Sequence, residues 1–256
     1  MRPRPLLLSI LFACAPIAAS EAQPPREAVQ MYSAGDFVGA ANAAGTADAV
    51  SLAFAARSLL AACVAANDPA ALDALLRRAE ASASAALALE PASVEARLQL
   101  ALAYGIRGKR ASLSEAFRHR YAARGRNLIN EAISLAPSDP RAHALLGAWH
   151  FEVIRRGGRA GAIMYGARIG AGSAAFERAM RLAPDDPLIA LHYGLALIQN
   201  DPRNAPRAAE LLRAAAEAPA RDALDRMARN EARRIGNLLA EAGPRAAAEA
   251  ARQSLL

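Results

Sequence analysis

Apolar runs separated by short proline-containing steps follow one another along the chain. Residues 131–147 read EAISLAPSDPRAHALLG, and residues 177–194 read ERAMRLAPDDPLIALHYG. In both stretches an apolar run ends at a proline, and an Asp-Pro step precedes the next run. Proline just past a helix end stops that helix, whereas aspartate caps the following helix and proline fits its first turn. The pattern predicts helices joined by short loops.

The phrase occurs two more times, in residues 86–104 and, in a decayed form, in residues 217–228. Its anchoring prolines, Pro91, Pro137, Pro184 and Pro219, are 46, 47 and 35 residues apart. Spacings of this size are typical of stacked helical hairpins. We therefore predict an all-α fold, a helical-hairpin repeat array with lengthened helices in two units. Helices are expected at residues 25–34, 36–44, 47–66, 69–89, 92–107, 112–135, 140–156, 160–182, 187–199, 204–217, 220–240 and 244–254.

Small and apolar residues at fixed places in these units resemble the tetratricopeptide repeat family. One unit has Leu146, Gly147 and His150 in its first helix and Phe176, Ala179 and Pro184 in its second. The units on either side match at Leu100, Ala101, Tyr104, Leu128, Ala132 and Pro137, and at Tyr193, Gly194, Leu197, Leu211, Ala214 and Pro219. The resemblance implies a helical solenoid whose concave face binds other proteins.

Two units are longer than the family's period of about 34 residues by roughly a dozen residues each. The extra residues fall in 107–126 and 155–172, between the first and second helix of each unit. We expect them to lengthen the helices, with a break at RGGRAG (residues 156–161). A flexible lid is the alternative, because six of the 16 glycines lie between Gly157 and Gly172.

The N-terminus reads as an export signal. Arg2 and Arg4 precede an apolar run, and small residues end it at Ser20–Ala22. The expected domains are a signal peptide at 1–22, a repeat domain at 23–240 and a C-terminal capping helix at 241–256. The mature chain, from Gln23, would be exported and periplasmic; lipid attachment at Cys14 is the alternative.

Positive charge is concentrated in the two inserts. The chain has a formal net charge of +7, and residues 107–126 carry seven basic side chains against Glu115. Residues 155–168 carry four arginines and no acid. An anionic partner or lipid headgroups would complement this charge, and a solvated helix face is the alternative. The predicted basic rim comprises Arg107, Lys109, Arg110, Arg155, Arg156 and Arg159.

The register of the resemblance places apolar side chains on the inner face of the first helices. Either a later helix of the same chain fills this groove, or a partner segment or apolar ligand does, because exposed apolar surface of this kind marks contact sites. Glu95, Arg141 and Glu152 are its polar exceptions. The predicted groove residues are Leu98, Leu102, Ile106, Phe151, Leu188, Leu191, Leu195 and Ile198.

Signatures of catalysis are missing from the sequence. There is no His-Glu-x-x-His, and His143 and His150, seven residues apart, read as packing positions. We expect no enzyme activity and no catalytic, cofactor or metal site.

The predicted function is a non-catalytic scaffold in the cell envelope that binds a protein through its groove. The alternative is a periplasmic ligand-binding component with an apolar pocket. The expected partner is thus a protein or an apolar, anionic ligand, with contact to a membrane surface as a further option and nucleic acid excluded by export. A groove sealed by the inserts would favour the ligand, and an open groove the protein.

Overall fold

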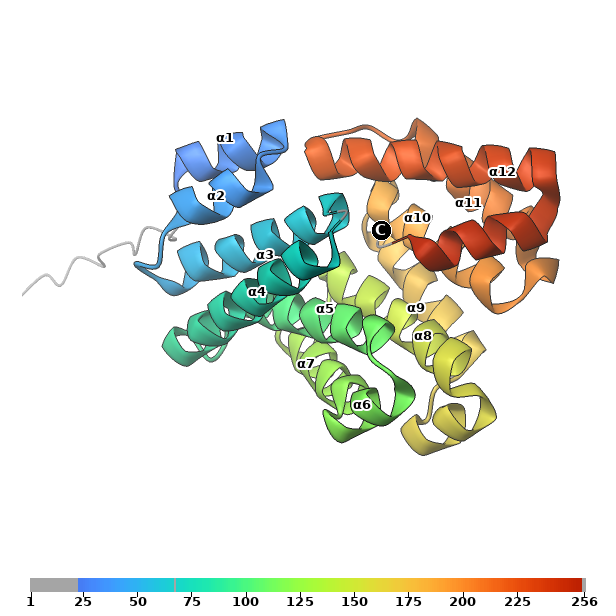
Figure 1. Cartoon of the computed structure of the whole chain (residues 1–256), viewed down its shortest axis with the longest axis horizontal. Helices are drawn as coiled ribbons and strands as arrows, with labels where there is room; N and C mark the ends of the chain where they lie inside the picture. Colours follow the sequence, from blue (N-terminus) through green and yellow to red (C-terminus); the bar gives the residue numbers. More distant parts are fainter. Residues whose placement is uncertain (1–22, 67, 255–256) are drawn as a thin grey trace, which may run out of the picture.

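A computed structural model describes residues 23–66 and 68–254, and within these ranges its regular structure is helical, without strands (Figure 1). This confirms the predicted all-α fold and is consistent with a helical repeat array. The signal peptide and Cys14 lie outside the described residues. The helices are α1 (Arg26–Ala34), α2 (Phe37–Ala44), α3 (Ala49–Ala65), α4 (Pro69–Leu89), α5 (Val94–Arg110), α6 (Leu113–Arg118), α7 (Tyr121–Leu135), α8 (Pro140–Tyr165), α9 (Ile169–Leu182), α10 (Pro187–Asn200), η1 (Pro202–Asn204), α11 (Ala205–Glu217) and α12 (Ala223–Gln253).

Aspartate side chains cap the starts of many helices. Asp48 accepts a hydrogen bond from the backbone N–H of Ser51 at 2.7 Å, and Asp68 accepts one from Ala71 at 2.8 Å. The predicted Asp-Pro starts are confirmed at α8 and α10, where Asp139 and Asp186 are N-caps and proline follows. These carboxylates satisfy backbone donors that have no partner inside the helix.

Helices pack as successive hairpins, α3 with α4, α5 with α7, α8 with α9, and α10 with α11. The first helices of these pairs also contact one another in the order α3, α5, α8, α10. Helix α12 then folds back across α10 and α11, and its beginning reaches α1 (Figure 1). There Arg226 donates to the carbonyl of Ser33 at 2.9 Å. The last helix therefore joins the two ends of the array.

Glycine allows α8 and α9 to approach closely. A Cβ at Gly147 would lie only 2.5 Å from Cδ2 of Phe176, whose side chain is fully buried. The small residue expected at this place is thus required by the ring that faces it. Many other core positions are alanines, which suits helices packed at short range.

The insert segments are helical but broken. Residues 112–135, expected as one helix, form α6 and α7, with Arg120 between them in the left-handed region (φ 55°). Helix α8 continues to Tyr165, and its kink at Gly158 (φ 56°, ψ −148°) confirms the break expected in RGGRAG. The C-terminal boundary expected near residue 241 is a kink at Gly243 within α12. None of the helices in the described part of the chain is long and apolar enough to cross a bilayer.

Candidate functional site

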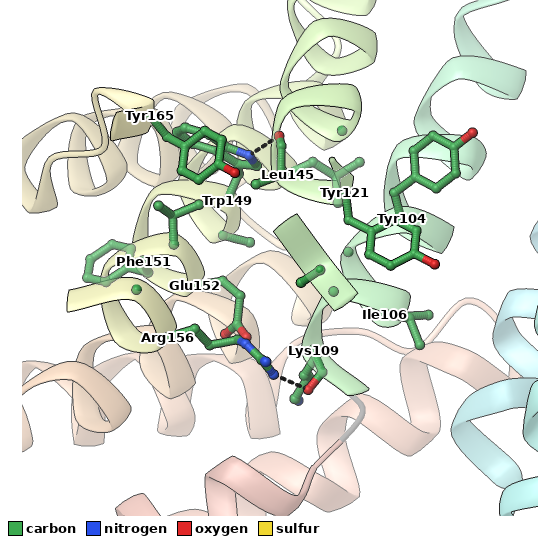
Figure 2. Close-up of a pocket in the computed structure, with 18 of the residues that line it drawn as sticks. Tyr104, Ile106, Lys109, Tyr121, Leu145, Trp149, Phe151, Glu152, Arg156 and Tyr165 are labelled. Atoms are coloured by element: carbon green, nitrogen blue, oxygen red, sulfur yellow. Dashed lines mark hydrogen bonds between the residues drawn. The ribbon is translucent and has the colours of Figure 1, made fainter. Parts of the chain in front are cut away.

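A cavity of about 340 Å³ lies between α5, α6, α7, α8 and α10 (Figure 2). Its size is in the range of small-molecule sites in proteins. Both insert segments contribute to its wall, α6 through Leu113 and Phe117, and the end of α8 through Gly161 and Tyr165. Six of the twelve aromatic residues of the chain line it: Tyr104, Phe117, Tyr121, Trp149, Phe151 and Tyr165.

The aromatic side chains of the wall are held in place by contacts with neighbouring residues. Trp149 donates its indole N–H to the carbonyl of Ala122 at 2.7 Å, and the Arg126 guanidinium lies 4.4 Å from the centre of the Trp149 ring system. The Arg124 guanidinium likewise lies 4.1 Å from the centre of the Tyr104 ring. Fixed rings lose little conformational freedom when a ligand packs on them, so this wall is pre-organised for apolar contact.

The opposite end of the cavity is polar and cationic, as Figure 2 shows for Lys109, Glu152 and Arg156. Glu152 is paired with Arg155 at 2.8 Å, and Arg156 donates to the carbonyls of Lys109 and Ala111 at the end of α5. Three cationic groups thus meet one carboxylate. Anionic groups are the natural complement of such an excess.

Lys109, the only lysine of the chain, has one partner here, the carbonyl of Ser254 just after α12. Burial lowers the pKa of its ammonium group. An ammonium has three N–H donors, so two remain for a ligand. A negative group beside it would offset the desolvation that lowers its pKa.

Two histidines in this region are held neutral by burial. Burial lowers the pKa of His192, a cavity-lining residue of α10, to about 4. His150 has a pKa of about 4 for the same reason, and its Nδ1 lies 3.2 Å from the backbone N–H of Arg168, which donates to it. Nδ1 must be unprotonated to accept this bond.

We therefore expect the fold to lose stability as the pH falls from 6.5 to about 4. In this window the unfolded chain protonates both His150 and His192, whereas the folded chain does not, so the free energy of unfolding falls by up to about 1.4 kcal/mol per pH unit for each histidine. Urea unfolding at pH 7, 6 and 5 measures this slope. Replacing His150 or His192 with glutamine should reduce the slope. Equal slopes in all variants would contradict the assignment.

The predicted groove residues divide into two groups. Leu102, Ile106, Phe151 and Leu195 line the cavity. The others belong to the core. Leu98 packs with α7 and α8, and α12, a later helix of the same chain, covers this face of α10, which is one of the two alternatives left open by the sequence. The core group comprises Leu98, Leu188, Leu191 and Ile198.

The predicted basic rim is divided as well. Lys109 and Arg156 line the cavity, and Arg155 pairs with Glu152 beside it. Arg107 instead faces α4, where it forms ion pairs with Asp73 and Glu80 and, through its hydrogen bond, lowers the pKa of Asp73. The remaining two rim residues, Arg110 and Arg159, are exposed.

Sequence reasoning missed most of the aromatic wall and His192. A usable signal was present, since half of the aromatic residues fall within residues 104–165, the two units with inserts. Among residues 23–66 and 68–254, no three side chains that bind metals form a cluster.

Comparison with known proteins identifies the family. The family model described as regulator of microtubule dynamics protein 1-3 matches residues 33–240. No curated protein matches the chain. The match corrects the assignment made from the sequence pattern, because degenerate positions such as Leu146, Gly147 and Phe176 indicate packed helical hairpins without specifying one family. The chain therefore belongs to the family of regulator of microtubule dynamics proteins 1-3.

Proposed function

We propose that this protein binds an elongated apolar molecule with an anionic head group in the cavity between α5, α6, α7, α8 and α10. The observation that carries this proposal is the participation of both inserts in the cavity wall. Both inserts line the pocket, which favours a small ligand over a folded partner because the pocket is the size of a ligand site and largely apolar.

The head group is proposed to lie at Lys109 and Arg156, and the apolar part to lie along Trp149 and Tyr165. The two groups of side chains are at opposite ends of the cavity in Figure 2. An anionic head gains charge-assisted hydrogen bonds from the two unused donors of Lys109. Binding of the tail is favoured because its apolar surface is removed from water.

Titration of the single tryptophan, Trp149, tests the proposal directly. Dodecyl phosphate, added below its micelle-forming concentration, should change the emission of Trp149 saturably with one site per chain, and dodecanol should bind more weakly. Lys109→Gln should weaken phosphate binding about tenfold or more and leave dodecanol binding nearly unchanged. An emission that does not respond, or equal affinity for both probes in the unmodified chain, would refute the proposal.

A protein partner is the second candidate. The family's name describes regulation of microtubule dynamics, which is action on a protein polymer. The observation in its favour is that Leu113 and Phe117 of the cavity wall are themselves exposed, about 60% of each residue's surface. An amphipathic helix of a partner presents the apolar side chains that such a site accepts. Co-sedimentation with assembled microtubules, compared between the unmodified chain and Phe117→Ser, tests this candidate, and equal sedimentation of both would count against it.

Export is also part of the proposal. The basic N-terminal residues, the apolar run and the small residues at 20–22 support cleavage before Gln23. Intact-mass measurement of the exported protein should give a chain that begins there. A lipid-modified chain beginning at Cys14 would refute cleavage before Gln23.

A further inference from the structure

Exposed apolar side chains gather on α6 and on the segment from the end of α8 to the start of α9. Nine large apolar residues of the described chain are exposed, and five of them come from these two segments. Ile163, at 80%, is the most exposed of the nine. Scattered exposed apolar residues are ordinary, whereas a group of them marks a contact surface. The five are Leu113, Phe117, Ile163, Met164 and Ile169.

The two segments lie side by side. Phe117 and Met164 line one shallow hollow, together with Arg118 and Arg120. Figure 1 shows α6 and the end of α8 at the same lower edge of the molecule, away from α1 and α12. We call this surface, residues 113–120 and 159–169, the α6–α8 face.

Arginines surround these apolar side chains. Arg118, Arg120, Arg159 and Arg168 are exposed, and Glu115 is the one acidic residue of the face. No salt bridge inside the described part of the chain involves any of the four arginines, although many arginines elsewhere are paired. The face therefore offers a net positive charge that the rest of the described chain does not neutralise by ion pairing.

We propose that the α6–α8 face docks on the surface of an anionic lipid bilayer. Exposed apolar side chains bordered by arginine are typical of segments that lie in a membrane interface. Phe117, Ile163 and Met164 insert at the boundary between head groups and acyl chains, and the arginines contact lipid phosphates. Acidic proteins would satisfy the charge, but five exposed large side chains on short, separate segments do not form the continuous groove that holds a peptide.

Docking goes beyond the proposed ligand binding and connects to it through two residues. Leu113 and Phe117 belong both to the α6–α8 face and to the wall of the cavity. A docked protein therefore holds this side of the cavity against the bilayer. Docking itself needs only the surface side chains and takes place whether the cavity is filled or empty.

Vesicle flotation with the full chain tests the proposal. The chain should float with vesicles of phosphatidylcholine that contain about one third phosphatidylserine, and much less with phosphatidylcholine alone, because each basic residue near an anionic surface contributes roughly 1 kcal/mol. Ile163→Ser/Met164→Ser and Arg118→Glu/Arg159→Glu should each reduce partitioning about tenfold or more. All four positions are exposed, so folding should be preserved, which circular dichroism checks.

Matched controls change exposed residues elsewhere. Leu89→Ser/Leu135→Ser removes two exposed leucines, and Arg181→Glu/Arg213→Glu reverses two exposed arginines. These variants should float nearly as well as the unmodified chain. No flotation with anionic vesicles, or equal losses in the test and control variants, would overturn the proposal. Capture by immobilised polyglutamate without flotation would also overturn it and indicate an acidic protein.

The two proposals fail separately. Gly105→Phe, whose ring takes up part of the cavity, should float normally. Normal flotation without a Trp149 response would refute the ligand and leave docking supported. A normal Trp149 response without flotation would refute docking alone.

Discussion

Gly105→Phe is expected to weaken ligand binding strongly while the protein stays folded. Gly105 lies within α5 and lines the cavity, and a Cβ added there would meet no atom within 4 Å. The new ring therefore has room to fold into place and occupies space that the ligand needs. Overlap of this kind costs about 1–3 kcal/mol, which corresponds to roughly 10- to 100-fold weaker binding.

Gly105→Ala is the matched control. Alanine adds one methyl group, leaves the cavity almost unchanged and removes the cost of glycine inside a helix, so it should raise the free energy of unfolding by up to about 1 kcal/mol. Titration of Trp149 with dodecyl phosphate should give normal affinity for Gly105→Ala and a large loss for Gly105→Phe. Normal binding by Gly105→Phe would show that the ligand does not occupy this cavity.

Phe176→Ala is expected to destabilise the fold by about 3–5 kcal/mol, the usual cost of removing a buried phenylalanine ring. The Phe176 side chain is fully buried, stacked on Tyr193 at a centroid distance of 4.9 Å and tilted against Phe151 at 6.1 Å. Its loss leaves a hole between α8, α9 and α10. Urea unfolding at pH 7 measures the change, and Phe117→Ala, at a ring 61% exposed, should alter stability by much less.

A double variant tests whether the Phe176 ring is the reason that position 147 requires a small residue. Gly147→Ala alone places a Cβ against Phe176 and should cost about 1–3 kcal/mol through overpacking. In the Phe176→Ala background the same change meets no ring. The double variant should therefore lose less stability than the sum of the losses in the two single variants. A coupling near zero in the double-mutant cycle would contradict the contact.

Helix starts and the all-α class were predictable from local chemistry. Asp139-Pro140 and Asp186-Pro187 begin α8 and α10, because capping and proline geometry depend on a few neighbouring residues. The small residues at Gly147 and Gly194 also lie where helices meet, each with side chains of the next helix beside it. The break within RGGRAG followed from the freedom of glycine, which adopts φ 56° at Gly158.

Long-range arrangement could not be predicted in the same way. Nothing near Leu191 or Ile198 in the sequence indicates that α12 returns to cover them, since this depends on how the whole array curves. The partners of Arg107 are on α4, and that of Lys109 follows α12, both distant in sequence. The break between α6 and α7 occurs at Arg120, where no glycine in the sequence indicates a change of direction.

The family was misassigned for a related reason. Small residues at helix crossings and prolines after helix ends are common to many arrays of packed hairpins. Their presence therefore indicates the helical architecture, which the structure confirms. It does not indicate the family, which comes from the match over residues 33–240.

Anomalous diffraction from a crystal of the protein with dodecyl phosphate that carries bromine on its terminal carbon tests the central claim most directly. In the proposed binding mode the anionic head lies at Lys109 and Arg156, so the bromine peak should lie beside Trp149 and Tyr165 at the opposite end of the cavity. Phosphate density should lie within hydrogen-bond distance of Nζ of Lys109. An empty cavity, or bromine found only on the outer surface of α6 and α8, would contradict the account.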